Sequence, residues 1–112
     1  MYSVIIPSIG RINFLNDLLE SIYNQTLLPD EIIIILDNNK LCRNKAKQIK
    51  TKYNCKIIYA DNLNLAQKRN YGVLISKSKF IIYSDDDDIW EINKSQKTIE
   101  CLHNYKVVFH EF

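Results

Sequence analysis

The chain alternates between short apolar runs and longer stretches in which apolar residues recur every three or four positions. Runs of the first kind are typical of buried strands, and they occupy residues 2–6, 31–36, 55–60 and 79–84. The second pattern predicts helices at 12–24, 63–76 and 93–104, with a polar helix around Ala46, Ile49 and Tyr53. A last apolar run, 106–112, predicts the opening of a fifth strand.

In two of the predicted helices, the residues that share one side can be named from their spacing. In the first, the apolar side carries Phe14, Leu15, Leu18, Leu19 and Ile22, which is the pattern of an amphipathic helix. In the helix at 63–76, the residues along one side are Leu65, Ala66, Arg69 and Val73.

The order of these elements predicts an α/β fold. The run "EIIIIL" at 31–36 is apolar throughout, as expected for a parallel strand covered on both faces. Alternating strands and helices imply three layers, with helices on both sides of an open, mostly parallel sheet joined by right-handed crossovers. No linker or repeat interrupts the pattern, so residues 1–112 are expected to form a single domain.

Composition narrows the classes of protein. The 112 residues are 46% hydrophobic, which is ordinary for a folded domain, and a net charge of +2 gives no reason to expect a nucleic-acid partner. The cysteines Cys42, Cys55 and Cys101 include no CxxC pair, so we expect reduced cytosolic thiols rather than a zinc site. No apolar run approaches the ~20 residues that cross a bilayer. We expect a cytoplasmic protein, with any membrane contact peripheral and at the inner face.

Polar residues follow each of the first four predicted strands. They are "PS" after the first, "DNN" after the second, "DNLN" after the third and "DDDD" after the fourth. In open parallel sheets, ligands bind outside the carboxyl ends of the strands, near the point where the strand order reverses. The sequence therefore predicts a polar pocket at this edge of the sheet.

The run Asp85–Asp88 is either a solvated acidic turn or a site for a divalent cation. The usual glycine-rich phosphate loops, GxGxxG and GxxxxGK[ST], are absent from the chain. An acidic pocket that holds a diphosphate needs a cation between the two, and Mg²⁺ or Mn²⁺ prefers oxygen ligands. If the segment stays extended, Asp85 and Asp87 point to one side, whereas Asp86 points to the other and is free to accept a hydrogen bond from a ribose hydroxyl.

Other polar residues near the predicted pocket each have two interpretations. Asp37 either accepts a hydrogen bond from a base N–H, as uracil offers, or caps the following helix. Ser8 either bonds a base or caps the helix that starts near Ile12. Lys68 and Arg69 supply cations that either pair with the acidic loop or contact phosphate.

Two segments resemble family 2 glycosyltransferases. The segment "SVIIPSIGRINFLNDLLESIYNQTLLPDEIIIILDNN" is similar to the family's opening, with its strand-Pro-Ser/Thr start, "S(I/V)xNQT" helix end and strand ending in Asp. The segment "NLNLAQKRNYGVLISKSKFIIYSDDDDIW" resembles the family's "N-x-G-x-x-x-A-R-N-x-G" helix and "D-x-D-D-x-W" (DXD) motif. The resemblance implies a nucleotide-diphospho-sugar transferase (GT-A, Rossmann-like) fold and a Mn²⁺ or Mg²⁺ ion. It also implies inverting sugar transfer from a nucleotide sugar, with UDP-sugars favoured, to a saccharide or lipid-linked acceptor.

The resemblance also implies roles for single residues. Those at nucleotide-contacting positions are Pro7, Ser8, Asp37, Asn64, Arg69, Asp85 and Asp86, and those at metal-binding positions are Asp87 and Asp85. Asn64 stands where the family has glycine, and Leu36 and Asp37 stand where it often has two aspartates. These departures leave the identity of the base open.

In this family the catalytic domain continues past the DXD segment into a half that binds the acceptor and supplies the general base. None of Glu91, Glu100 and Glu111 is identified as that base. We therefore expect a truncated half that binds the sugar donor, is incomplete for catalysis and self-associates. The alternatives are a degenerate module that binds a nucleotide without turnover, and a metal-dependent phosphotransfer domain. The second is disfavoured because the first strand ends in "PSIG" rather than DxDx[TV].

Overall fold

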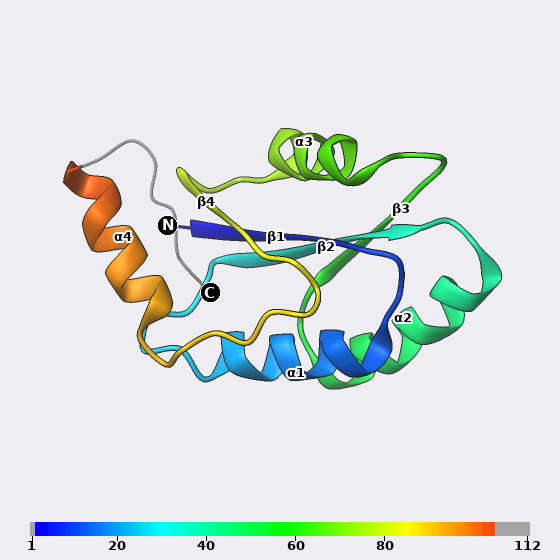
Figure 1. Cartoon of the computed structure of the whole chain (residues 1–112), viewed down its shortest axis with the longest axis horizontal. Coiled ribbons are helices and arrows are strands. Elements are labelled where there is room, and N and C mark those ends of the chain that lie inside the picture. The colour runs from blue at the N-terminus through cyan, green and yellow to red at the C-terminus, as the bar shows by residue number, and fades with distance from the viewer. Residues whose placement is uncertain (1, 105–112) are drawn as a thin grey trace.

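The computed structural model describes residues 2–104, which form four strands and four helices in alternation (Figure 1). The strands are β1 (Tyr2–Ser8), β2 (Glu31–Asp37), β3 (Lys56–Ala60) and β4 (Phe80–Tyr83). The helices are α1 (Ile12–Tyr23), α2 (Lys40–Lys52), α3 (Leu65–Ile75) and α4 (Lys94–Asn104). The predicted alternation is confirmed as far as α4. The predicted fifth strand, with Glu111 on it, lies outside the described residues.

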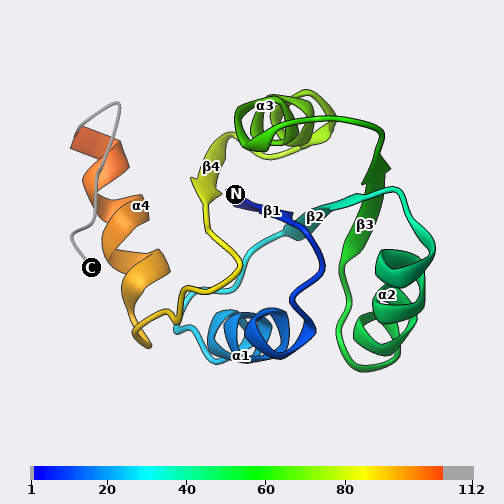
Figure 2. The same ribbon diagram turned by 45° about the vertical axis from the view of Figure 1, so that its right-hand side comes forward.

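The four strands run parallel in one sheet, in the order β3-β2-β1-β4. The chain adds β2 and β3 on one side of β1 and then crosses to the other side for β4. In register, Ile5 of β1 lies between Ile33 of β2 and Tyr83 of β4. Helices α1 and α2 cover one face of the sheet and α3 covers the other (Figure 2). The predicted three-layer α/β fold is therefore confirmed.

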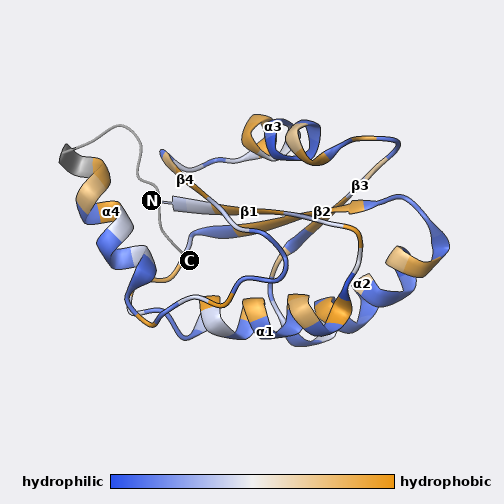
Figure 3. Cartoon of the chain, viewed as in Figure 1, coloured by the Kyte–Doolittle hydropathy of each residue, from blue (hydrophilic) through white to orange (hydrophobic). Residues whose placement is uncertain are grey.

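The strands are continuously apolar because both faces of the sheet are covered. Alternate side chains of a strand point to opposite faces, so each strand contributes to two clusters. On the side of α1 and α2, the buried strand residues include Val4, Ile6, Ile32, Ile34 and Leu36. Beneath α3 the buried residues are Ile5, Ile33, Ile35 and Ala60. Figure 3 shows the hydrophobic colour along β1 and β2 and on the side of α1 that faces the sheet.

Helix α1 is an amphipathic surface helix. In α1 the buried residues are Leu15, Leu18, Leu19 and Ile22, as predicted. Phe14 departs from the prediction: it is 47% exposed, and the guanidinium of Arg11 lies 5.0 Å from its ring centre. None of the helices within residues 2–104 is long and apolar enough to cross a membrane.

The side of α3 that packs against the sheet is not the side that the sequence pattern marked. Leu65 and Val73 are exposed, whereas Lys68 and Gly72 are buried. A Cβ atom on Gly72 would lie 2.5 Å from Cγ2 of Ile5, so the helix approaches β1 more closely than any other residue would allow there. Periodicity misled because α3 meets the sheet through a glycine and a lysine, and neither adds to an apolar pattern.

Candidate functional site

A polar cleft lies at the carboxyl ends of the strands, beside the point between β1 and β4 where the strand order reverses. Its volume is about 430 Å³. Of the residues that the sequence predicted for the site, those lining the cleft are Pro7, Ser8, Asp37, Asn64, Asp85, Asp86 and Asp87. Arg69 is the one predicted residue that does not line it. Strand ends far apart in the sequence are thus brought to one place, as the fold class predicts.

The acidic segment after β4 forms a turn. The N–H of Asp88 donates to the carbonyl of Asp85 over 3.2 Å, and the N–H of Asp85 donates to Oδ2 of Asp88 over 3.2 Å. Aspartate favours such turns because its side chain bonds to nearby backbone groups. The segment is therefore not extended, and the roles of the four aspartates follow from the turn instead.

The turn brings three carboxylates together. Asp85, Asp87 and Asp88 each offer an oxygen, and these oxygens all lie within 4.8 Å of one another. Burial raises the pKa of Asp88; the charges of Asp85 and Asp87 add to this shift, while the backbone N–H of Asp85 and the ammonium of Lys94 oppose it. Clustered carboxylates repel one another, and Mg²⁺ and Mn²⁺ are held by such oxygens. The three side chains fit a divalent metal, and they include Asp88, which sequence reasoning had not singled out as a ligand.

Asp86 faces away from this cluster and is only 3% exposed. The hydroxyl of Ser8 donates to its Oδ2 over 2.7 Å, and the guanidinium of Arg11 donates to both of its oxygens, with Nε 3.2 Å from Oδ2. The hydrogen bond to Asp86 raises the pKa of Arg11, against a smaller opposing effect of burial. Protein donors thus already bond both oxygens of Asp86, and its contact with a ribose hydroxyl stays a prediction.

Arg11 is a charged residue of the cleft that sequence reasoning missed. It lines the cleft, and its NH2 nitrogen lies 4.0 Å from Oδ2 of Asp87, so the side chain lies between the buried and the exposed aspartates. Its position in the loop after β1, three residues beyond Ser8, was the available signal, because that loop leaves the same edge of the sheet.

At the other end of the cleft, Asp37 forms an ion pair with Lys68, with 2.7 Å between Oδ1 and Nζ. The cap of α2 is Asn39, whose side chain accepts from the N–H of Cys42, so Asp37 is not the helix cap. The hydroxyl of Ser8 accepts from the N–H of Gly10 and donates to Asp86, and α1 has no side-chain cap bond. The capping alternatives for Asp37 and Ser8 are therefore excluded.

Asn64 and Arg69 lie at the margin of the cleft. Asn64 caps α3: its side chain accepts from the N–H of Gln67, and the side chain of Gln67 accepts from the N–H of Asn64. Arg69 pairs with Asp85 at 2.9 Å, and its guanidinium carbon lies 6.0 Å from the ring centre of Tyr83. Both predicted residues thus have structural partners, and Arg69 contacts the cleft only through Asp85.

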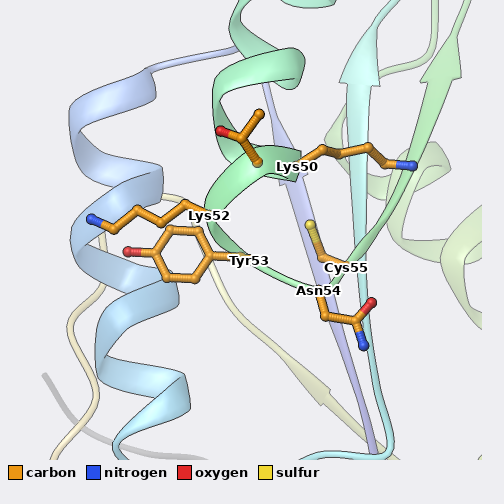
Figure 4. Close-up of a pocket in the computed structure, with 6 residues that line it drawn as sticks. Lys50, Lys52, Tyr53, Asn54 and Cys55 are labelled. Carbon is orange, nitrogen blue, oxygen red and sulfur yellow. The ribbon is translucent and has the colours of Figure 1, made fainter.

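A second hollow, of about 350 Å³, lies at the opposite edge of the sheet, where α2 leads into β3. Figure 4 shows its lining: Lys50, Lys52, Tyr53, Asn54 and Cys55 come from one short stretch of chain, together with Thr51. Its residues include no carboxylate. The hollow is separate from the cleft and lies at the edge of the sheet where ligands of this fold class do not usually bind.

Comparison with known proteins gives consistent matches along nearly the whole chain. The model of the family described as "Glycosyl transferase family 2" matches residues 3–110. The chain is 31% identical to an uncharacterized glycosyltransferase of Rickettsia bellii, over 96% of this chain and 16% of the relative. It is 31% identical to the minor teichoic acid biosynthesis protein GgaB of Bacillus subtilis, over 93% of this chain and 12% of the relative. The chain thus spans less than a fifth of the length of either relative.

Solved structures share the fold. TarS residues 1–349 of S. aureus in complex with UDP superpose with a TM-score of 0.72 at 19% identity, over 94% of this chain and 32% of that chain. The same TarS segment in another crystal structure gives a TM-score of 0.75 at 18% identity, over 94% of this chain and 33% of that one. At this level of identity the likeness shows the arrangement of strands and helices.

Proposed function

The chain belongs to glycosyl transferase family 2 and has its GT-A fold, and we propose that the cleft binds a nucleotide-diphospho-sugar together with Mn²⁺ or Mg²⁺. One observation carries this proposal. A single cleft contains an acidic cluster at one end and a partly exposed carboxylate, Asp37, at the other. A nucleotide diphosphate matches that arrangement, because its base presents N–H groups and its diphosphate requires a cation beside carboxylates.

At the base end, Asp37 accepts a hydrogen bond from a base N–H. Its side chain is 39% exposed, and the ion pair with Lys68 uses Oδ1, which leaves Oδ2 for a ligand. Pro7 and Ser8 form the wall beside it, and Asn64 lies at the margin. A uracil base fits this proposal, since its N3 carries a hydrogen, and the TarS structure that shares the fold was solved with UDP.

At the diphosphate end, Asp85, Asp87 and Asp88 hold the metal. When bound, a divalent cation would offset the negative charge that develops on the diphosphate as its bond to the sugar breaks. Arg69 holds Asp85 in place, and Arg11 holds Asp86 so that the turn keeps its shape. These residues therefore serve the departure of the nucleotide.

The transfer itself is inverting in this proposal, and its acceptor is a saccharide or a lipid-linked acceptor. The relative GgaB is named for teichoic acid biosynthesis, which supports a role in building a polymer. Inversion requires a general base near the acceptor hydroxyl. Within residues 2–104, each carboxylate of the cleft already has another role in this proposal: it contacts the nucleotide base, binds the metal or holds the turn. None of them is left to act as the general base. We therefore propose that this chain supplies the half of the site that binds the sugar donor.

Calorimetry with UDP and Mn²⁺ tests the proposal. Mn²⁺ alone is expected to bind weakly, and more tightly once UDP is present, because diphosphate oxygens and water complete its ligands. Asp87→Ala should remove the metal-dependent part of UDP binding, whereas Asp17→Ala, at an exposed position on α1, should leave it unchanged. Equal Mn²⁺ affinity with and without UDP would contradict the metal site.

A further inference from the structure

Lys68 is the one lysine or arginine that is buried among residues 2–104, with 4% of its surface exposed. It lies in the first half of α3, over the carboxyl ends of β1 and β2. Its Nζ donates to the carbonyl of Ser8 over 3.0 Å and lies 2.7 Å from Oδ1 of Asp37. One ammonium group therefore ties the helix to the ends of two neighbouring strands, at the base end of the cleft.

These contacts continue across the cleft floor. The carbonyl of Ser8 accepts a hydrogen bond from Lys68, and the hydroxyl of Ser8 donates to Asp86. Asp86 also accepts a hydrogen bond from Arg11. A continuous series of polar contacts thus runs from Asp37 at one end to Arg11 at the other. Lys68 is the member that fixes Asp37 relative to this series.

The stability of the fold gives no reason for a lysine at this position. Replacing an ion pair that is at least partly buried by apolar groups of similar volume is often neutral or stabilising, and ordering a lysine side chain costs rotamer freedom. The close approach of α3 to the sheet is set one turn away, where Gly72 contacts Ile5. What the ammonium adds is a fixed orientation for a carboxylate that faces the cleft.

We propose that Lys68 is a positioning residue for base recognition. By holding Oδ1 of Asp37, it directs Oδ2 toward the ring N–H of the base. This inference rests on the proposed binding of a nucleotide, and it names the chemistry that is selected: a base with a hydrogen on the ring nitrogen, such as uracil.

The chemistry of the bases makes the inference specific. N3 of uracil carries a hydrogen and donates to a carboxylate, whereas N3 of cytosine is an acceptor and repels one. A carboxylate in a fixed orientation discriminates strongly between uracil and cytosine in binding affinity, since cytosine leaves the carboxylate without a hydrogen-bond donor. A carboxylate that rotates freely can turn toward solvent, so it discriminates less between the two bases.

The test is the ratio of UDP to CDP affinity, measured by calorimetry with Mn²⁺ present. We expect the parent chain to prefer UDP and Lys68→Met to lower that preference by about tenfold or more, the scale of a lost hydrogen bond to a charged group. Asp37→Asn should lower it as well. Adding Lys68→Met to Asp37→Asn should cause little further change, because both substitutions act on the same carboxylate.

Two further variants complete the experiment. Lys47→Met removes an exposed lysine on α2 and should leave the preference unchanged, whereas Lys68→Arg keeps the charge and should restore part of it. If the parent prefers UDP and Lys68→Met shows the same preference, Lys68 is a structural ion pair and the inference is overturned, while the proposed function stands. Failure of both Lys68 variants to fold would also overturn it, because the lysine would then be required for stability. If the parent itself does not bind UDP, the proposed function fails and the inference fails with it.

Discussion

At the scale of the residue, neighbouring aspartates in one short turn have opposite surroundings. Asp87 is half exposed and shares its space with Asp85 and Asp88. Asp86, one position earlier, is buried and bonded by Ser8 and Arg11. The turn separates a carboxylate that a ligand can reach from one that holds the loop to the end of β1.

This difference predicts opposite phenotypes for two alanine substitutions. Asp86→Ala should lower the free energy of unfolding by about 1–3 kcal/mol, because the hydroxyl of Ser8 and the guanidinium of Arg11 lose their partner. Asp87→Ala should change stability by less than ~0.5 kcal/mol, as surface substitutions usually do. Urea denaturation followed by circular dichroism measures both. Equal stability of the two variants would show that Asp86 does not anchor the turn.

At the scale of the element, one carboxylate joins the strands at the edge of the sheet opposite the cleft. Glu31, at the start of β2, accepts from the hydroxyl of Ser3 on β1 over 2.7 Å and from the ammonium of Lys56 on β3 over 3.1 Å. It also accepts from the N–H of Lys77, in the segment before β4, over 2.5 Å. Burial would raise the pKa of Glu31, but these three partners outweigh it and hold the pKa below its ordinary value of 4.5.

The lowered pKa predicts a pH-dependent contribution to stability. The folded state binds the proton of Glu31 less readily than the unfolded state does, so the contribution is fully present above pH 4.5 and is lost as the pH falls through the folded pKa. Glu31→Gln should therefore destabilise the chain by about 1–2 kcal/mol at pH 7 and by progressively less below pH 4.5. Denaturation at a series of pH values measures this, with Glu20→Gln, at an exposed position on α1, as the control. A stability difference that stays constant with pH would contradict the assignment.

The elements also show what the sequence could and could not predict. The strands were predictable because their apolar runs reflect burial on both faces, and the polar residues after them placed the cleft at one edge of the sheet. The side of α3 that packs against the sheet was not predictable, because Gly72 and Lys68, which are not apolar side chains, make that contact. The bond from Arg11 to Asp86 was not predictable either, because it joins segments 75 residues apart, which no local pattern records. The turn at Asp85–Asp88 is held by local bonds, and the run of aspartates is compatible with it.

At the scale of the whole molecule, the described residues form the part of the fold that we propose holds a nucleotide. The chain spans 16% and 12% of two relatives that it matches along nearly its whole length. Of the strands described, β4 has a partner on one side only, so its other edge is open to further pairing. We expect the isolated chain to self-associate through that edge, which sedimentation at several concentrations would show.

We also expect little transfer activity from the isolated chain. Positioning of the acceptor supplies up to ~7–11 kcal/mol of barrier lowering and a general base contributes ~10²–10⁴-fold, and the described residues account for neither. Incubation with UDP-sugars and simple saccharide acceptors should give at most slow hydrolysis of the sugar donor. Robust, metal-dependent formation of a glycoside would contradict this prediction and would direct the search for the base to Glu91 and Glu100.

The central claim, that this cleft holds a nucleotide diphosphate and a divalent metal, is tested most directly by a crystal structure of the chain with UDP and Mn²⁺. We expect the anomalous signal of manganese beside the carboxylates of Asp85, Asp87 and Asp88, with diphosphate oxygens among its ligands. We also expect N3 of uracil within hydrogen-bond distance of Asp37. Manganese away from the acidic turn, or UDP bound outside the cleft, would contradict the account.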